Sequence, residues 1–104
     1  SNSGETREIL SGFPTLKEIG CNIISITSNL DSTMAKNSDI HICIGKLKEA
    51  DHLNLAPTTS STVTLIMGDA LAVTVSYLKE FKKEDFALYH PGGSLGKNLT
   101  GKEI

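Results

Sequence analysis

The first six residues combine groups that can bind a phosphate: the hydroxyls of Ser1, Ser3 and Thr6, the amide of Asn2, and Gly4, which lets the backbone approach a ligand closely. An apolar pattern of helical period follows them, so this segment is predicted to be a loop that opens a helix. Hydroxyls and the unpaired N–H groups of a first helical turn then point at one spot, which favours a phosphate. The alternative is an ordinary helix N-cap, with Ser3 or Thr6 as the capping residue and Glu8 in the first turn.

Two residues further along the chain are of the types that transfer protons. Glu49 lies in a segment that leaves a predicted strand, and His90 stands before Pro91, which disfavours helical geometry at the histidine. Without other information, Glu49 is a solvated surface charge and His90 a structural loop histidine. We assign no role to His41, on a strand face, or to His52, in a charged connection.

Length and composition indicate a single small globular domain, or a piece of one. The chain has 104 residues, of which 38% are hydrophobic and 21% charged. Its net charge of −2 argues against a nucleic-acid binder, which normally carries a basic stripe. No apolar run is expected to approach the roughly 18 residues of a membrane span, and no signal peptide is visible. We therefore expect a cytoplasmic protein without a membrane partner, with Cys21 and Cys43 as reduced core thiols.

The first half of the sequence reads as a βαβ unit. The predicted elements are a helical stretch over 6–20 broken at Gly12 and Pro14, a strand over 22–27, a short helix capped by Asp31, and a strand over 39–44. Strand, helix and strand in that order predict a parallel sheet with a right-handed crossover. In open α/β folds a phosphate loop follows a buried strand, and none precedes Ser1. We therefore expect the sequence to be part of a larger domain.

The second half is dominated by one long predicted helix. Residues 45–55 form a charged connection at the carboxyl end of a strand, where such folds place their ligands. Residues 57–60 then form a helix N-terminal signal, and a helix follows to about Phe81. This helix is apolar on two sides, so it must be buried on both. The second partner is either another subunit, which predicts a homo-oligomer, or the rest of a larger monomer. Residues 89–97 are glycine-rich and are predicted to form turns.

Several of these stretches follow one another in a familiar order: Ser-Asn-Ser-Gly-Glu-Thr-Arg-Glu (1–8), Lys-Glu-Ala (48–50), Leu-Ala-Pro-Thr-Thr-Ser-Ser-Thr (55–62), Met-Gly-Asp-Ala-Leu-Ala-Val (67–73) and Asp-Phe-Ala-Leu-Tyr-His-Pro-Gly-Gly-Ser-Leu-Gly (85–96). Together they resemble the sugar-isomerase (SIS) domain of the arabinose 5-phosphate isomerases. The first stretch alone is typical of many SIS domains, whereas the histidine-containing stretch is more specific to this isomerase group.

The resemblance implies a three-layer α/β/α sandwich with a mostly parallel sheet, in a homo-oligomeric enzyme, a dimer or tetramer. It implies isomerisation between D-ribulose 5-phosphate and D-arabinose 5-phosphate, a step toward the eight-carbon acidic sugar KDO of outer membrane or capsule. In that family Ser1, Asn2, Ser3 and Thr6 fall on the phosphate-binding loop. Three further residues fall on positions associated with the active site: Glu8, Glu49 and His90.

The reaction that the resemblance implies gives each group a role. Of Glu49 and His90, one is the base on the carbon-bound proton and the other moves the oxygen-bound protons of an enediol mechanism, without a metal or cofactor; which residue does which stays open. Glu8 orients the loop or contacts a sugar hydroxyl, and we favour the positioning role. Residues 1–104 match the C-terminal portion of an SIS domain, without its first strands and helices and without the CBS modules that often follow it. The alternative function is a non-catalytic SIS domain that binds a phosphosugar and regulates a partner. A related isomerase acting on another phosphosugar is also possible on this sequence.

Overall fold

The structure is a computed structural model that describes residues 1–100. The chain divides into two compact units: a first unit, Ser1–Met67, and a second unit that begins at Gly68. The elements are α1 (Arg7–Leu10), α2 (Phe13–Ile19), β1 (Ile24–Thr27), α3 (Thr33–Lys36), β2 (Ile40–Cys43), α4 (Thr59–Leu78), α5 (Lys83–Tyr89) and α6 (Ser94–Thr100). The helix α4 begins in the first unit and ends in the second.

The first unit contains the predicted parallel sheet. Strands β1 and β2 pair in parallel, with Ile24 opposite Ile40 and Thr27 opposite Cys43. The helix α3 connects them, so the predicted βαβ order and the α/β class are confirmed. The predicted helical break is also confirmed: α1 ends at Leu10, Pro14 lies in the first turn of α2, and Gly20 ends α2 in the left-handed conformation at φ +88°.

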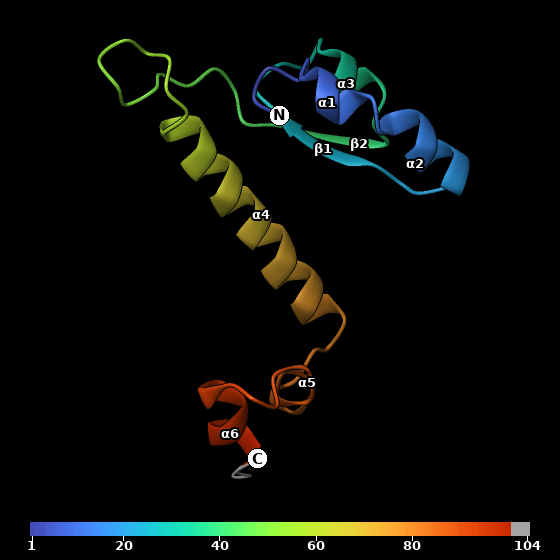
Figure 1. The fold of residues 1–104 in the computed structure, drawn as a ribbon, viewed down its shortest axis with the longest axis vertical. Helices are drawn as coiled ribbons and strands as arrows, with labels where there is room; N and C mark the ends of the chain where they lie inside the picture. The colour runs from blue at the N-terminus through green and yellow to red at the C-terminus, as the bar shows by residue number, and fades with distance from the viewer. Residues whose placement is uncertain (101–104) are drawn as a thin grey trace. The chain divides into compact units, whose positions relative to one another are not determined.

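The core of the first unit lies between the sheet and its three short helices. Phe13 of α2, Met34 of α3 and Ile23, just before β1, are buried together, with Leu10 of α1 packed against them. In Figure 1, α1, α2 and α3 lie along the strand pair. On the opposite face, the paired side chains of Ile24 and Ile40 are exposed. Within the described part of the first unit, helices therefore cover one face of the sheet, as expected of an incomplete α/β/α sandwich.

The N-cap of α3 is Ser32, so the prediction of Asp31 was wrong. The buried Ser32 hydroxyl accepts a hydrogen bond from the Ala35 N–H at 3.2 Å. The N–H of Asp31 is instead bound by the side chain of Asn29 at 2.9 Å, which holds Asp31 in the preceding turn. The helix consequently begins one residue later than a cap at Asp31 requires.

Gly4 packs against the protein itself, and this differs from our expectation of close approach to a ligand. Its φ is +70°, and a Cβ at this position would collide with the side chain of Ser32 and crowd that of Thr27. The glycine is therefore required by the contact between the N-terminal loop and the start of α3.

The helix α4 ends three residues earlier than predicted. Glu80 adopts the left-handed conformation at φ +54°, and the Phe81 N–H donates to the Ser76 carbonyl at 3.0 Å. The Glu80 N–H donates to the Tyr77 carbonyl at 3.1 Å, which completes a Schellman motif. A glutamate in this conformation is uncommon, so no residue type before Phe81 signalled the end of the helix.

The exposed apolar surface of α4 is extensive. Side chains that are largely exposed include Leu65, Ile66, Val73, Tyr77 and Leu78. With 20 residues and a largely apolar composition, α4 is long and apolar enough to cross a membrane, so the expectation that no segment approaches this length was wrong. A single such helix is weak evidence for a span, because core helices of soluble proteins meet the same criteria.

The second unit contains two helices in a region where we predicted turns. Residues 89–97 include the end of α5 and the start of α6, and the turn is confined to residues 90–93. Gly96 lies inside α6, so only Gly92 and Gly93 belong to the turn. The glycine content therefore predicted an irregular segment that is longer than the turn in the structure.

Both cysteines are free thiols on the surface of the structure, which corrects the prediction that they are core residues. Cys21 lies between the left-handed end of α2 and the first buried residue before β1. Cys43 is the last residue of β2, whose burial pattern leaves both of its ends exposed.

Candidate active site

The hydroxyls of the N-terminal loop are organised by local hydrogen bonds. The Ser1 Oγ and Thr6 Oγ1 atoms lie 2.6 Å apart, and the Gly4 N–H donates to Ser1 Oγ at 3.1 Å. The Glu5 N–H donates to Ser3 Oγ at 3.1 Å. Thr6 occupies the N-cap position of α1 but makes no side-chain capping bond. The Thr6 hydroxyl therefore pairs with the Ser1 hydroxyl and does not cap α1.

The loop is also fastened to the carboxyl end of β1. The backbone carbonyl of Asn2 accepts two hydrogen bonds from Ser28, from its N–H at 2.8 Å and from its hydroxyl at 2.7 Å. Ser28 directly follows the last residue of β1. The loop therefore lies at the carboxyl end of a parallel strand, where open α/β folds bind their ligands.

A cavity of about 490 Å³ lies between this loop and the start of α4. From the loop it is lined by Ser1 and Asn2, and from the segment that opens α4 by Pro57, Ser60, Ser61, Thr64 and Leu65. The hydroxyl-bearing lining residues come from two segments more than 50 residues apart in sequence. The structure thus brings two of the four predicted phosphate-binding residues to a cavity whose other wall is also hydroxyl-rich.

Glu49 is buried, with 9% of its surface exposed, and its carboxylate binds the start of α4. Its Oε1 accepts from the Ser60 N–H at 2.9 Å. Its Oε2 accepts from the Ser60 hydroxyl at 2.8 Å and from the Thr58 N–H at 3.3 Å. The hydrogen bond from the Ser60 N–H, followed by that from the Ser60 hydroxyl, holds the pKa of Glu49 below its ordinary value. Glu49 is therefore not a solvated surface charge in the structure; its carboxylate is buried and bound to the start of α4.

The segment around Glu49 is held by further side-chain bonds to the backbone. The Glu49 N–H donates to the Asn54 side chain at 2.6 Å, and the Ala50 N–H donates to Thr58 Oγ1 at 2.8 Å. Asp51 accepts from the N–H groups of Leu55 at 2.8 Å and Ala56 at 3.0 Å. Residues 49–58 contain no helix or strand, yet these bonds define their path.

Glu8 lies on α1 and is exposed. It is not among the residues that line the cavity beside Ser1 and Asn2. The structure therefore does not bring Glu8 to the cavity wall in the first unit.

His90 is the C-cap residue of α5 in the second unit. Its backbone, at φ −128° and ψ 51°, lies outside the helical region, as the following Pro91 predicts. Its ring stacks on Phe86 with centroids 4.0 Å apart, and its Nδ1 lies 2.8 Å from the Phe86 carbonyl oxygen. A carbonyl can only accept, so Nδ1 carries the proton and Nε2 of the neutral ring is left as the basic nitrogen.

Sequence reasoning missed the residues that open α4. It took 57–60 only as a helix start, whereas Ser60 binds Glu49 and also lines the cavity with Ser61 and Thr64. The available signal was the uninterrupted run of hydroxyl residues over 58–62, more than one N-cap requires. His41, to which we gave no role, lies with its Nε2 2.7 Å from the hydroxyl of the fully buried Thr27.

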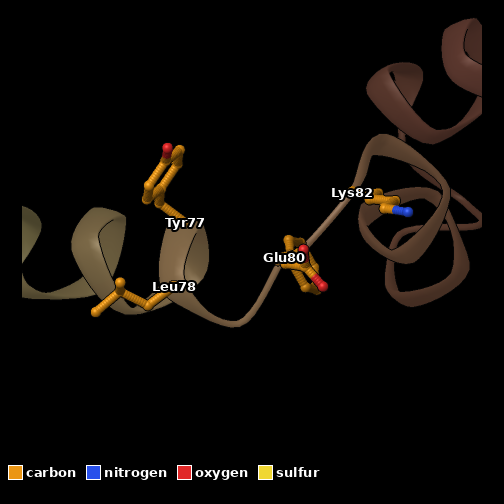
Figure 2. A pocket seen from close by; sticks show the side chains of 5 residues that line it. Tyr77, Leu78, Glu80 and Lys82 are labelled. Carbon is orange, nitrogen blue, oxygen red and sulfur yellow. The ribbon is translucent and has the colours of Figure 1, made fainter.

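A second cavity, of about 450 Å³, lies where α4 ends. Figure 2 shows Tyr77 and Leu78 on the last turn of α4, and Glu80 and Lys82 on the segment that leads to α5. Tyr77 and Leu78 are largely exposed. This cavity contains none of the predicted site residues. Among residues 1–100, no group of three or more His, Cys, Asp or Glu residues is arranged to hold a metal ion.

Comparison with known proteins identifies relatives over the whole chain. The SIS domain family matches residues 1–74. The arabinose 5-phosphate isomerase KdsD of Yersinia pestis is 56% identical over an alignment that covers 100% of this chain and 34% of that protein. KdsD of Escherichia coli K12 is 52% identical with the same coverage. The chain therefore spans about a third of the length of these curated relatives.

A solved structure is similar in three dimensions as well. The E. coli CFT073 protein c3406, determined in complex with arabinose 5-phosphate, matches with a TM-score of 0.80 and 50% sequence identity. The match covers 88% of this chain and 48% of that one. The two proteins are therefore similar in sequence as well as in their α/β architecture.

Proposed function

Because the chain belongs to the SIS domain family, we propose that it acts as part of a sugar-phosphate isomerase that interconverts D-ribulose 5-phosphate and D-arabinose 5-phosphate. The names of the KdsD relatives and the sugar phosphate bound in the structural neighbour support this substrate. The reaction moves a proton between C1 and C2 of the sugar through an enediol, so it needs a base beside the carbonyl and a donor for the developing oxygen charge.

The observation that carries the proposal is the cavity between the N-terminal loop and the start of α4. Ser1 and Asn2 line it from one side, and Ser60, Ser61 and Thr64 line it from the other. A phosphosugar has a charged group at one end and hydroxyls along its length. Hydroxyl and backbone N–H donors bind both without a basic side chain.

In this proposal the N-terminal loop binds the phosphate. Ser1 and Thr6 present paired hydroxyls, and Ser3 and Asn2 lie between them in the same loop. His90 transfers protons, and its basic Nε2 suits that role because Nδ1 is bound to the Phe86 carbonyl. Glu49 and Glu8 complete the residues that we assign to the active site.

The wider setting follows from the same proposal. The enzyme is a cytoplasmic homo-oligomer, either a dimer or a tetramer, and its product enters KDO synthesis. The apolar side chains exposed on α4 support the oligomer, because a helix apolar on two sides needs a partner on each.

The test follows the conversion of ribulose 5-phosphate by NMR with the full-length protein, beside His90→Ala and His52→Ala variants. His52 is an exposed histidine without an assigned role, so it is the matched control. We expect arabinose 5-phosphate to form with the wild type and the His52 variant, and its formation to fall by at least about 100-fold in the His90 variant. Binding of the sugar phosphate without any conversion by the wild type would instead support the regulatory SIS domain.

A further inference from the structure

We propose that Glu49 is a positioning residue: its carboxylate fixes the first turn of α4, and with it the cavity wall opposite the N-terminal loop, and it does not take a proton from the sugar. The inference rests on the proposed isomerase function and deepens it. It assigns the proton transfer at the sugar carbon to another group and gives Glu49 a structural role in holding the segment that forms one wall of the cavity.

Both carboxylate oxygens of Glu49 accept hydrogen bonds from the protein. Oε1 accepts from the Ser60 N–H, and Oε2 accepts from the Ser60 hydroxyl and the Thr58 N–H. All three donors belong to the segment that opens α4. A catalytic base must direct a free lone pair at the substrate proton, whereas the Glu49 carboxylate is directed at a helix start.

The N-terminus of α4 is stabilised by a nearby negative charge. A helix of 20 residues presents unpaired N–H groups and a partial positive charge at its N-terminus. The first turn of α4 contains no acidic residue of its own. Glu49 supplies the negative charge from a segment 11 residues away in sequence, through the Ser60 N–H.

Ser60 connects the Glu49 carboxylate to the cavity. Ser60 is buried and lines the cavity together with Ser61 and Thr64, which lie on the same two turns of α4. The backbone and the hydroxyl of Ser60 are both held by Glu49. Loss of the carboxylate frees this turn and displaces the wall that faces Ser1 and Asn2.

The ionisation of Glu49 agrees with this geometry. The same hydrogen bonds lower its pKa, and a carboxylate with a lowered pKa is a weaker base. An efficient general base has a pKa near the working pH, which for a carboxylate requires a shift in the other direction.

The experiment compares Glu49→Gln and Glu49→Ala in the full-length protein. Glutamine has the shape of the native side chain and keeps an acceptor for the Ser60 N–H, but it cannot take a proton. We expect Glu49→Gln to keep kcat within about tenfold of the wild type, with the larger change in KM. We also expect it to continue to exchange the transferred sugar proton with D₂O. Glu49→Ala leaves the turn without an acceptor, so we expect its KM to rise by about tenfold or more.

The control is Glu18→Gln, an exposed glutamate of α2, which should leave kcat, KM and exchange unchanged. A base at Glu49 would instead give a Glu49→Gln protein whose kcat falls by at least about 100-fold at unchanged KM, with exchange lost. That result overturns the positioning role while the isomerase function stands.

A wild-type protein that does not isomerise would refute the proposed function, and binding then tests the inference separately. The affinity for arabinose 5-phosphate, measured by calorimetry, should fall in Glu49→Ala and stay within a few-fold in Glu49→Gln. Equal affinity of Glu49→Ala and the wild type would overturn the positioning role.

Discussion

The hydroxyls of Ser1 and Thr6 lie 2.6 Å apart, and neither is used to cap α1. One of the two donates to the other, so the pair retains one hydroxyl hydrogen for an external acceptor. In the proposed site, a phosphate oxygen would be such an acceptor.

We therefore expect Thr6→Val, which keeps the shape and removes the hydroxyl, to weaken phosphosugar binding by about tenfold to a hundredfold. A hydrogen bond to a charged group contributes about 1.5–3 kcal/mol. The measurement is the dissociation constant of arabinose 5-phosphate by calorimetry. Thr15→Val, at an exposed threonine of α2, is the control and should bind as the wild type does. Unchanged affinity in Thr6→Val would remove Thr6 from the phosphate site.

Gly4→Ala is expected to destabilise the protein by about 2–5 kcal/mol, from a non-glycine residue at positive φ and from overpacking. The added methyl collides with Ser32, the N-cap of α3, and crowds Thr27. Urea unfolding measures the change. Gly92→Ala is the matched control, because a Cβ there meets nothing within 4 Å. Equal unfolding midpoints for the two variants would contradict the close contact at Gly4.

Acid is expected to destabilise the protein through Glu49 and Glu5. The Glu5 carboxylate accepts from the Thr33 N–H at 2.7 Å, and this backbone bond lowers its pKa as the Ser60 N–H lowers that of Glu49. A carboxylate whose pKa is lowered by folding stabilises the protein above its unfolded pKa, and this stability is lost as pH falls through the folded value. For both groups the loss begins near the ordinary value of 4.5 and continues below it.

Thermal midpoints between pH 7 and pH 3 test this expectation in the wild type and in Glu49→Gln. The wild type should be the more stable protein at pH 7, and the difference should shrink as the pH falls below 4.5. A constant difference across this range would show that ionisation of Glu49 does not contribute to stability.

Glu80→Gly is expected to stabilise the protein by about 0.5–1 kcal/mol, because glycine adopts the left-handed conformation without the Cβ penalty. Glu80 holds this conformation at φ +54°, where α4 ends. Glu84→Gly, in the first turn of α5, should instead lower stability, since it places glycine inside a helix. Denaturant midpoints of the two variants should thus move in opposite directions.

The parts of the fold that were predictable are those with a local cause. The β-branched run before Thr27 and the alternation from Ile40 predicted both strands, and Gly12, Pro14 and Gly20 predicted where the helices break and end. The end of α4 at Leu78 was not predictable, because the left-handed conformation of Glu80 that follows it comes from a hydrogen-bonded motif and not from a residue preference.

The candidate site was predictable in its residue types and less so in its contacts. The hydroxyl content of residues 1–6 was enough to mark the N-terminal loop. Ser60 and Glu49 are separated by an irregular segment that has no periodicity, so the sequence does not predict the hydrogen bonds between them. Gly4 was expected beside a ligand, but its neighbours are Ser32 and Thr27, which lie more than 20 residues away in sequence.

The two hydrogen bonds from Ser28 to the Asn2 carbonyl join residues 26 positions apart. They restrict the backbone of the N-terminal loop when the protein folds, before any ligand arrives. A loop ordered in advance loses little conformational entropy on binding, so more of the interaction energy with a phosphate remains as affinity. Small phosphorylated molecules, which offer few contacts, benefit most from a receptor that is rigid before they bind.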